Sequence, residues 1–136
     1  MQPSDITAAH EHTIHRPDAV RHFMRFKPVH ATVTVRRGDR VLARSDAAMR
    51  LTEIGHDIYD PVFYIPAGDV VADLAPVPDR STHCPLKGDA SYFTDIDGTT
   101  IAWTYDRPLA FSAMLEGHVA FYPNLVTVEE RGAEAA

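Results

Sequence analysis

Residues 83–92 (HCPLKGDASY) hold the side chains of this chain that are best suited to chemistry. They include the one cysteine of the sequence, Cys84, with His83 beside it and Lys87 three residues later. A thiol attacks as its thiolate, which a nearby imidazole or ammonium favours when solvent reaches the sulfur. The residue types therefore predict a site in which Cys84, His83 and Lys87 are the candidate catalytic groups. The alternative is a structural loop, because a free cysteine usually packs as a small apolar side chain.

A proline and a glycine shape the backbone of this segment. Pro85 fixes its own φ and keeps Cys84 near extended angles, whereas Gly88 permits a sharp, left-handed turn. Side chains of adjacent residues on a strand point to opposite faces, so His83 and Cys84 need not meet. That geometry argues against a simple cysteine–histidine dyad and leaves the role of the thiol open.

Aromatic and polar residues beyond the segment complete a predicted ligand pocket. If the segment shares a sheet with the neighbouring strands, seven side chains line or anchor one concavity: Tyr64, His83, Cys84, Lys87, Asp89, Tyr92 and Trp103. Apolar walls with a few convergent polar groups are typical of small-molecule sites. For Tyr92 and Trp103 the competing interpretation is packing in the core.

Histidines near the N-terminus form a separate candidate, a metal site made by His10, His12 and His15. His10 and His12 would share one face of an extended segment, and imidazole suits zinc, copper or nickel. A firm metal site also needs surrounding side chains that orient its ligands, which a polar terminus lacks. We therefore expect no metal in the main site and keep these histidines as the alternative.

Two acidic pairs have residue types that suit other chemistry. Asp57 and Asp60 flank Tyr59 and would suit acid–base catalysis if buried together, but we expect them to cap a turn. Asp95 and Asp97, in the string DIDG, match part of a calcium-binding loop. The downstream acidic ligands and the closing glutamate of such a loop are missing, so this string is predicted to be a turn.

Short β-type segments separated by turn signals run through most of the chain. Strands are predicted at residues 30–35, 41–45, 48–53, 61–66, 70–74, 91–96, 100–105, 119–122 and 126–128. Alternating apolar and polar side chains, or β-branched and aromatic residues, favour them. Turns are predicted at residues 37–39, 76–78 and 97–98, the last being an Asp-Gly pair typical of hairpins.

Helix is predicted at only two places. Residues 17–26 have a proline in the first turn and apolar residues at helical spacing, and residues 108–115 end before Gly117. The expected organisation has three parts: an N-terminal arm with a short helix (residues 1–29), one β-rich domain (residues 30–128) and a frayed tail (residues 129–136).

Composition narrows the classes of function. The 136 residues carry a net charge of −6 at pH 7, which argues against nucleic acid as a partner because phosphate binding needs a basic surface. No apolar run approaches the roughly 20 residues that span a bilayer, and the N-terminus lacks the pattern of a secretion signal. One cysteine cannot form an internal disulfide. We therefore expect a soluble cytoplasmic protein that has neither nucleic acid nor a membrane as partner.

A second copy of the chain is the macromolecular partner that the sequence favours. Residues 1–50 carry nine Lys and Arg against five Asp and Glu, whereas residues 51–136 carry four against fourteen. Such asymmetry can drive self-association. An exposed strand at the edge of a sheet would offer a route to a homodimer.

Six segments of the chain carry a family resemblance: residues 43–45, 55–57, 64–70, 82–92, 103–105 and 117–122. In this order they resemble a bacterial family known as domain-of-unknown-function family 427. The resemblance implies a compact, mainly β fold of the β-tent type, in which two antiparallel sheets lean together, here with one or two short helices. It implies no activity and no cofactor, because the family has no agreed function.

The single cysteine excludes a cofactor site that is common among relatives by fold. Relatives by fold often hold a structural zinc on two Cys-x-x-Cys pairs, and a chain with one cysteine cannot build that site. The nucleotidyltransferase-like label sometimes given to the family gains no support, since Gly88 stands alone in its segment and forms no glycine-rich phosphate loop.

Three interpretations of function follow. The first is a small-molecule-binding domain, with or without catalysis, that uses the pocket at residues 83–92. The second is a protein-interaction or structural module in which the same segment only stabilises the fold. The third is a metal-binding protein that uses the N-terminal histidines.

Overall fold

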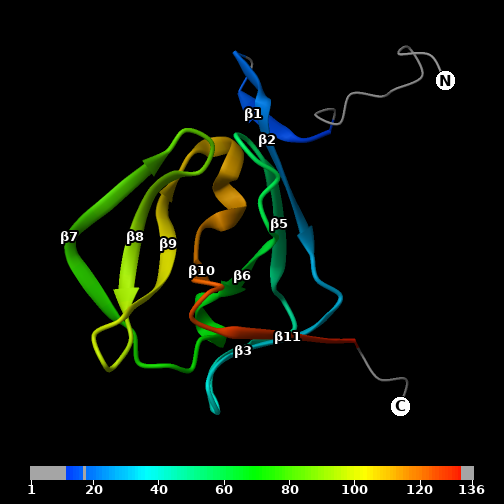
Figure 1. The fold of residues 1–136 in the computed structure, drawn as a ribbon. Coiled ribbons are helices and arrows are strands. Elements are labelled where there is room, and N and C mark those ends of the chain that lie inside the picture. Colours follow the sequence, from blue (N-terminus) through cyan, green and yellow to red (C-terminus); the bar gives the residue numbers. More distant parts are fainter. Residues whose placement is uncertain (1–11, 17, 133–136) are drawn as a thin grey trace.

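The computed structural model describes residues 12–16 and 18–132. In these residues eleven strands form two antiparallel sheets, one of eight strands and one of three (Figure 1). Two short 3-10 helices, η2 (Ala67–Asp69) and η3 (Ala110–Leu115), lie between strands. The predicted class, mainly β with two antiparallel sheets, is confirmed. Within the described ranges, neither helix is long and apolar enough to cross a membrane.

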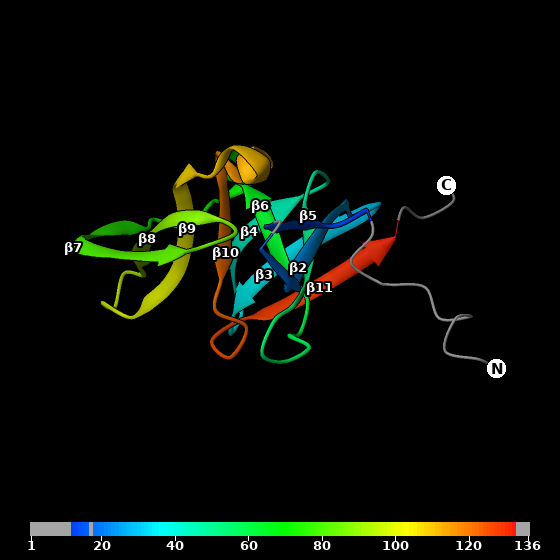
Figure 2. The ribbon, with the colours of Figure 1, turned by 90° about the horizontal axis from the view of Figure 1, so that it is seen from above.

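The larger sheet contains most of the strands, and each strand is antiparallel to its neighbours. Its order is β1 (Ile14–Arg16), β2 (Ala19–Pro28), β5 (Met49–Ile54), β6 (Val62–Pro66), β10 (His118–Phe121), β9 (Thr100–Pro108), β8 (Gly88–Thr94) and β7 (Ala75–Cys84). We call β1, β2 and β5 the first wing and β7, β8 and β9 the second wing. The two wings lie on opposite sides of the central strands β6 and β10 (Figures 1 and 2).

The smaller sheet packs on one face of the central strands. It consists of β11 (Thr127–Gly132), β3 (Ala31–Arg37) and β4 (Arg40–Ser45). Val35 and Leu42 of this sheet join Ile65 and Phe121 of the larger sheet in one buried cluster. Tyr64, next to Ile65 on β6, belongs instead to a second cluster on the opposite face. This alternation buries β6 on both faces, and the second cluster lies on the side where the wings face each other.

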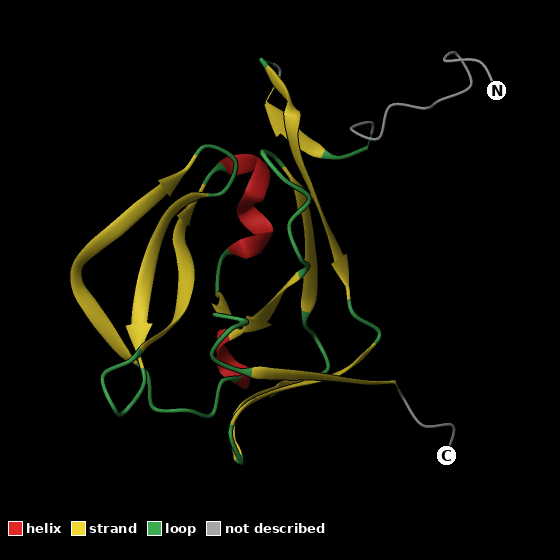
Figure 3. Ribbon diagram, in the orientation of Figure 1, coloured by secondary structure: helices red, strands yellow, loops and turns green. Residues whose placement is uncertain are grey.

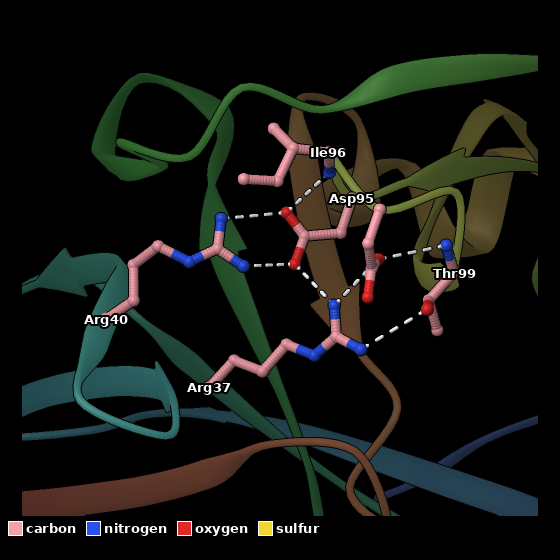
Figure 4. Close-up of polar contacts among 6 residues, drawn as sticks. Arg37, Arg40, Asp95, Ile96 and Thr99 are labelled. Atoms are coloured by element: carbon pink, nitrogen blue, oxygen red, sulfur yellow. Dashed lines mark hydrogen bonds and ion pairs between the residues drawn. The ribbon is translucent and has the colours of Figure 1, made fainter.

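Two arginines tie the smaller sheet to the hairpin of β8 and β9. Arg40 donates from both terminal nitrogens to the carboxylate of Asp95, and Arg37 donates to Asp95 at 2.7 Å and to Asp97 at 2.9 Å (Figure 4). Arg37 also reaches Oγ1 of Thr99 at 3.2 Å. The side chain of Asp95 is fully buried. We call these residues the arginine clamp. The DIDG string is therefore a turn, as predicted, whose acidic side chains bind arginines.

The helix predicted at residues 17–26 is wrong, because residues 19–26 form most of β2. Met24 pairs with Glu53 and Phe26 with Leu51, and both Met24 and Phe26 contact the second cluster. Apolar residues in this segment fit a period of two as well as a helical period. This segment forms a strand and not a helix because it hydrogen-bonds to a strand on each side, β1 and β5.

Three further predictions need correction. Residues 70–74 form no strand, since Val70 makes only an isolated bridge to Ala43. Residues 76–78 are part of β7 and not a turn, because β7 is an edge strand where prolines need not donate to a ladder. The predicted frayed tail is wrong for residues 129–132, which continue β11, while residues 133–136 lie outside the described residues.

Local signals located the remaining elements well. The hairpin turns at residues 37–39 and 97–98 are confirmed, with Gly98 at a φ of +84°. The second predicted helix corresponds to η3, which is of the 3-10 type. These elements set up the surface on which residues 83–92 lie.

Candidate functional site

Gly88 begins β8 where the chain turns back after β7. Its φ is +114°, and a Cβ atom there would lie 2.4 Å from the carbonyl oxygen of Arg107 and 2.9 Å from the nitrogen of Leu109. No side chain fits at such a close backbone contact. The left-handed turn predicted at Gly88 is thus confirmed, and it presses against the end of β9.

The helix η3 anchors the turn of residues 85–87. Buried Ser112 donates from Oγ to the carbonyl of Leu86 at 2.6 Å, and the N–H of Leu109 donates to the carbonyl of Lys87 at 2.9 Å. In Figure 3, η3 lies between the two wings. These bonds hold the backbone of Lys87 while its buried side chain extends toward the first wing.

Lys87 forms an ion pair with a carboxylate of the opposite wing. Its Nζ lies 2.8 Å from Oε1 of Glu53 on β5, and Oε2 of Glu53 accepts a hydrogen bond of 2.6 Å from Nε2 of His22 on β2. The side chains of Lys87 and Glu53 are 11% and 13% exposed. We call this set the Lys87–Glu53–His22 triad. It connects the first wing to the turn between β7 and β8 of the second wing.

The electrostatics of the triad keep Lys87 and Glu53 charged. Burial alone would raise the pKa of Glu53, but the ammonium of Lys87 and the hydrogen bond from His22 outweigh it and lower that pKa. Burial alone would lower the pKa of Lys87, but the facing groups of Tyr64 and Glu53 outweigh it and raise that pKa. Lys87 is therefore an ammonium near neutral pH, which donates hydrogen bonds and is not a nucleophile.

A cavity of about 200 Å³ opens beside the triad. We call it the aromatic cavity, because five of its lining side chains are aromatic. The lining consists of Leu51, Glu53, Val62, Tyr64, Lys87, Tyr92, Trp103, Tyr105 and Tyr122. The ring of Trp103 packs edge-on to Tyr64 with centroids 6.5 Å apart, and tilted against Tyr122 at 4.9 Å. Nε1 of Trp103 donates to the Tyr64 hydroxyl at 3.4 Å.

The tyrosines next to Lys87 are neutral hydroxyl groups. Burial raises the pKa of Tyr64 and of Tyr105 well above the ordinary value for tyrosine. The Nζ of Lys87 lies 5.7 Å from the centroid of the Tyr105 ring, a cation–π contact. The inner part of the cavity therefore combines one ammonium, one paired carboxylate and protonated phenols.

A second cation lies at the rim of the aromatic cavity. The guanidinium of Arg80, on β7, stacks 4.1 Å over the ring of Tyr92. Arg80 also hydrogen-bonds the hydroxyl of Tyr122, which opposes the rise in the pKa of Tyr122 that burial causes. The Tyr92 hydroxyl is 2.6 Å from Oγ1 of Thr82. Tyr92 is therefore held in place by Arg80 at the face of its ring and by Thr82 at its hydroxyl.

His83 and Asp89 pair with each other outside the cavity. They are directly opposite on β7 and β8, with Nδ1 of His83 2.8 Å from Oδ1 of Asp89, and their side chains are 61% and 45% exposed. Cys84, by contrast, is half-buried against the second cluster. His83 and Cys84 thus differ in environment, as strand geometry predicts. Of the predicted pocket residues, four line the aromatic cavity: Tyr64, Lys87, Tyr92 and Trp103.

The family model of a domain of unknown function, DUF427, matches residues 25–132. The chain belongs to the DUF427 family. No curated protein matches it. Residues 83–92 and every side chain that lines the aromatic cavity lie within the matched range of this DUF427 domain.

Sequence reasoning missed several residues of the site in this DUF427 domain. Glu53 follows Leu51 on the inward face of β5, with exposed Thr52 between them, so an acidic residue on the buried face of a strand was the available signal. His22 was missed because a helix was predicted at residues 17–26. Arg80 was missed because a turn was predicted at residues 76–78, which belong to the same strand, β7. Of these residues, Glu53 meets Lys87 only because the wings fold toward each other, whereas His22 and Arg80 contact residues of their own wing.

The alternative sites lie elsewhere in the chain. His10 is outside the described residues, His12 is exposed and His15 is half-buried in β1. Across residues 12–16 and 18–132, no group of three histidine, cysteine or acidic side chains is arranged to hold a metal ion. Asp57 is exposed and accepts from the N–H of Ile58 at 2.8 Å, so it sits in a turn, as expected.

Proposed function

We propose that this DUF427 domain binds a small molecule in the aromatic cavity. The ligand stacks on the rings that form the walls and accepts hydrogen bonds from Lys87. The observation that carries the proposal is the Lys87–Glu53 ion pair, which is nearly buried and lines the cavity.

A buried ion pair is a poor way to stabilise a fold. The loss of hydration of two charges offsets most of their attraction, and well-packed apolar side chains of similar size often stabilise as well or better. Apolar side chains would also pack at the positions of Glu53 and Lys87, because the nearby Leu51 and Leu86 are already buried in the second cluster. A charged pair at this place supports a role in binding.

The size and chemistry of the walls support a ligand with one ring. An apolar cavity of about 150 Å³ in a protein holds a molecule of the size of benzene. The aromatic cavity, at about 200 Å³, has room for one ring with a short substituent. Trp103 and Tyr122 pack against each other and both line the cavity, and flat ligands favour such aromatic walls.

The tryptophan of this chain makes the proposal directly testable. Trp103 is the single tryptophan, so its indole N–H gives one signal in a ¹H–¹⁵N spectrum of the full chain. A set of single-ring compounds that carry acidic, basic and neutral substituents is titrated against the protein. We expect at least one compound to shift the Trp103 indole signal in a saturable way.

Matched variants locate the binding. Tyr122→Ala removes part of the wall and should weaken the response, whereas Phe111→Ala removes an aromatic side chain that is 44% exposed on η3 and should leave it unchanged. If no compound in the set moves the Trp103 signal, the proposal is wrong and the domain is better explained as an interaction module. If Phe111→Ala weakens binding as much as Tyr122→Ala, the cavity is not the site.

A further inference from the structure

The polar groups around the aromatic cavity also select the charge of its ligand. We infer that the ligand is a planar monoanion: a single-ring aromatic or heteroaromatic carboxylate whose ring stacks on Trp103 and Tyr122 and whose carboxylate faces Lys87. This inference rests on the proposed function and narrows it to one chemical class.

The cavity is rich in donors. Lys87 has three N–H groups, and Glu53 takes one of them through Oε1. The Tyr64 hydroxyl accepts from Nε1 of Trp103, which leaves its own proton available for a ligand. Tyr105 and Tyr64 stay protonated, so each brings a hydroxyl donor to the same cavity.

The one carboxylate of the lining is already compensated. Oε1 of Glu53 faces the ammonium of Lys87, and Oε2 accepts from His22. A cationic ligand would have to compete with Lys87 for the same oxygen, at a distance where the two positive charges repel each other. The lining therefore offers an anion unused donors and offers a cation an acceptor that is already occupied.

The charge balance of the walls points in the same direction. Lys87 in the cavity and Arg80 at its rim each contribute one positive charge, and Glu53 contributes one negative charge. The sum over these three side chains is +1. A monoanion brings this sum to zero, and a carboxylate matches the donors of an ammonium and a guanidinium. The flat ring faces then favour a planar acid over a branched aliphatic one.

The test compares three probes of nearly equal shape on the full chain, followed by the Trp103 indole signal. The probes are benzoate, its neutral amide benzamide and the cation benzylammonium. We expect benzoate to bind about tenfold more tightly than benzamide, and benzylammonium to bind more weakly than either. The advantage of benzoate should shrink as salt is raised.

Variants assign the preference to Lys87. Lys87→Gln should reduce the ratio of benzoate to benzamide affinity to about one, whereas Lys27→Gln, at the other lysine of the chain, should leave it unchanged because that residue is exposed on β2. If Lys87→Gln alone fails to fold by circular dichroism, the neutral double variant Glu53→Gln/Lys87→Gln retains an amide pair and replaces it.

The outcomes separate this inference from the proposed function. Equal affinities for benzoate and benzamide, or tighter binding of benzylammonium, would overturn the charge class while leaving a ligand-binding cavity. Binding of other single-ring compounds but of none of the three probes would overturn it as well. Absence of any binding by either set of compounds would overturn both.

Discussion

The arginine clamp and the Lys87–Glu53–His22 triad are two clusters of charged side chains that are built differently. The clamp joins the smaller sheet to the hairpin of β8 and β9, and the triad joins the two wings of the larger sheet. In the clamp, both oxygens of Asp95 accept from arginine, and Arg37 continues to Asp97. In the triad, Lys87 gives one N–H to Glu53 and keeps others beside a cavity. Donors matched by protein acceptors indicate a structural role. Unmatched donors facing a cavity indicate binding.

Removing Asp95 from the clamp should change the stability of the protein more than any other substitution considered. Asp95→Ala removes a fully buried carboxylate that two arginines and the N–H of Ile96 contact. We expect the free energy of unfolding to fall by about 3 kcal/mol, measured by denaturant titration. Asp97→Asn is the control, because Asp97 is 53% exposed and ion pairs between exposed side chains contribute little to stability. A smaller loss for Asp95→Ala than for Asp97→Asn would contradict the structural role of the clamp.

Acid should remove the contribution of the clamp. Hydrogen bonds from Arg40 are the main reason that the pKa of Asp95 is lowered to about 2 from 3.8. A carboxylate whose pKa is lower in the folded state stabilises the fold above its unfolded pKa, and that contribution is lost as pH falls through the folded pKa. The advantage of the wild type over Asp95→Asn should therefore be constant above about pH 5 and shrink toward about pH 2. A difference that stays constant over this range would exclude the clamp as its cause.

A change in the triad should affect ligand binding more than stability. Lys87→Gln should lower the free energy of unfolding by only about 1 kcal/mol, since Glu53 keeps its hydrogen bond from His22. Its effect on benzoate binding should be about tenfold. The two quantities are measured on the same sample by denaturant titration and by the Trp103 indole signal. A large loss of stability with unchanged binding would place the triad in the same class as the clamp.

The smallest effect is expected at the outer face of residues 83–92. His83→Gln and Asp89→Asn break an exposed cross-strand pair, and such pairs contribute roughly 0.2–1 kcal/mol. We expect neither variant to change ligand binding in the same titration, since neither side chain lines the cavity. Loss of binding in either variant would show that the outer face of the segment takes part in the site.

The same contrast explains what the sequence could predict. Hairpins such as that at Asp97 and Gly98 were predicted because the turn chemistry is local, and Gly88 was predicted to turn for the same reason. Of the residues that line the aromatic cavity, Lys87 and Trp103 were predicted as pocket residues from their types. Glu53 was not, because its meeting with Lys87 depends on how the eight-stranded sheet folds back on itself. Local signals predict turns and strands, whereas the partner of a buried charge depends on long-range pairing.

The outward position of His83 and Asp89 shows the limit of a motif as a guide to a site. The string HCPLKGDASY has the residue types of one chemical unit, but its strand residues alternate between two faces. Tyr92 lines the cavity, whereas His83 and Asp89 lie outside it, and Lys87 reaches the cavity from the turn between β7 and β8. The period of the strand therefore decides which half of such a motif can touch a ligand.

The apolar double variant Glu53→Leu/Lys87→Met tests most directly whether the ion pair serves binding. If the ion pair serves binding, this variant should have an unchanged or higher free energy of unfolding, because apolar packing replaces two buried charges. The Trp103 indole signal should then no longer respond to benzoate. The contrary result, a loss of several kcal/mol in stability with benzoate binding retained, would mean that the pair holds the two wings together and that the ligand, if any, is recognised by other groups.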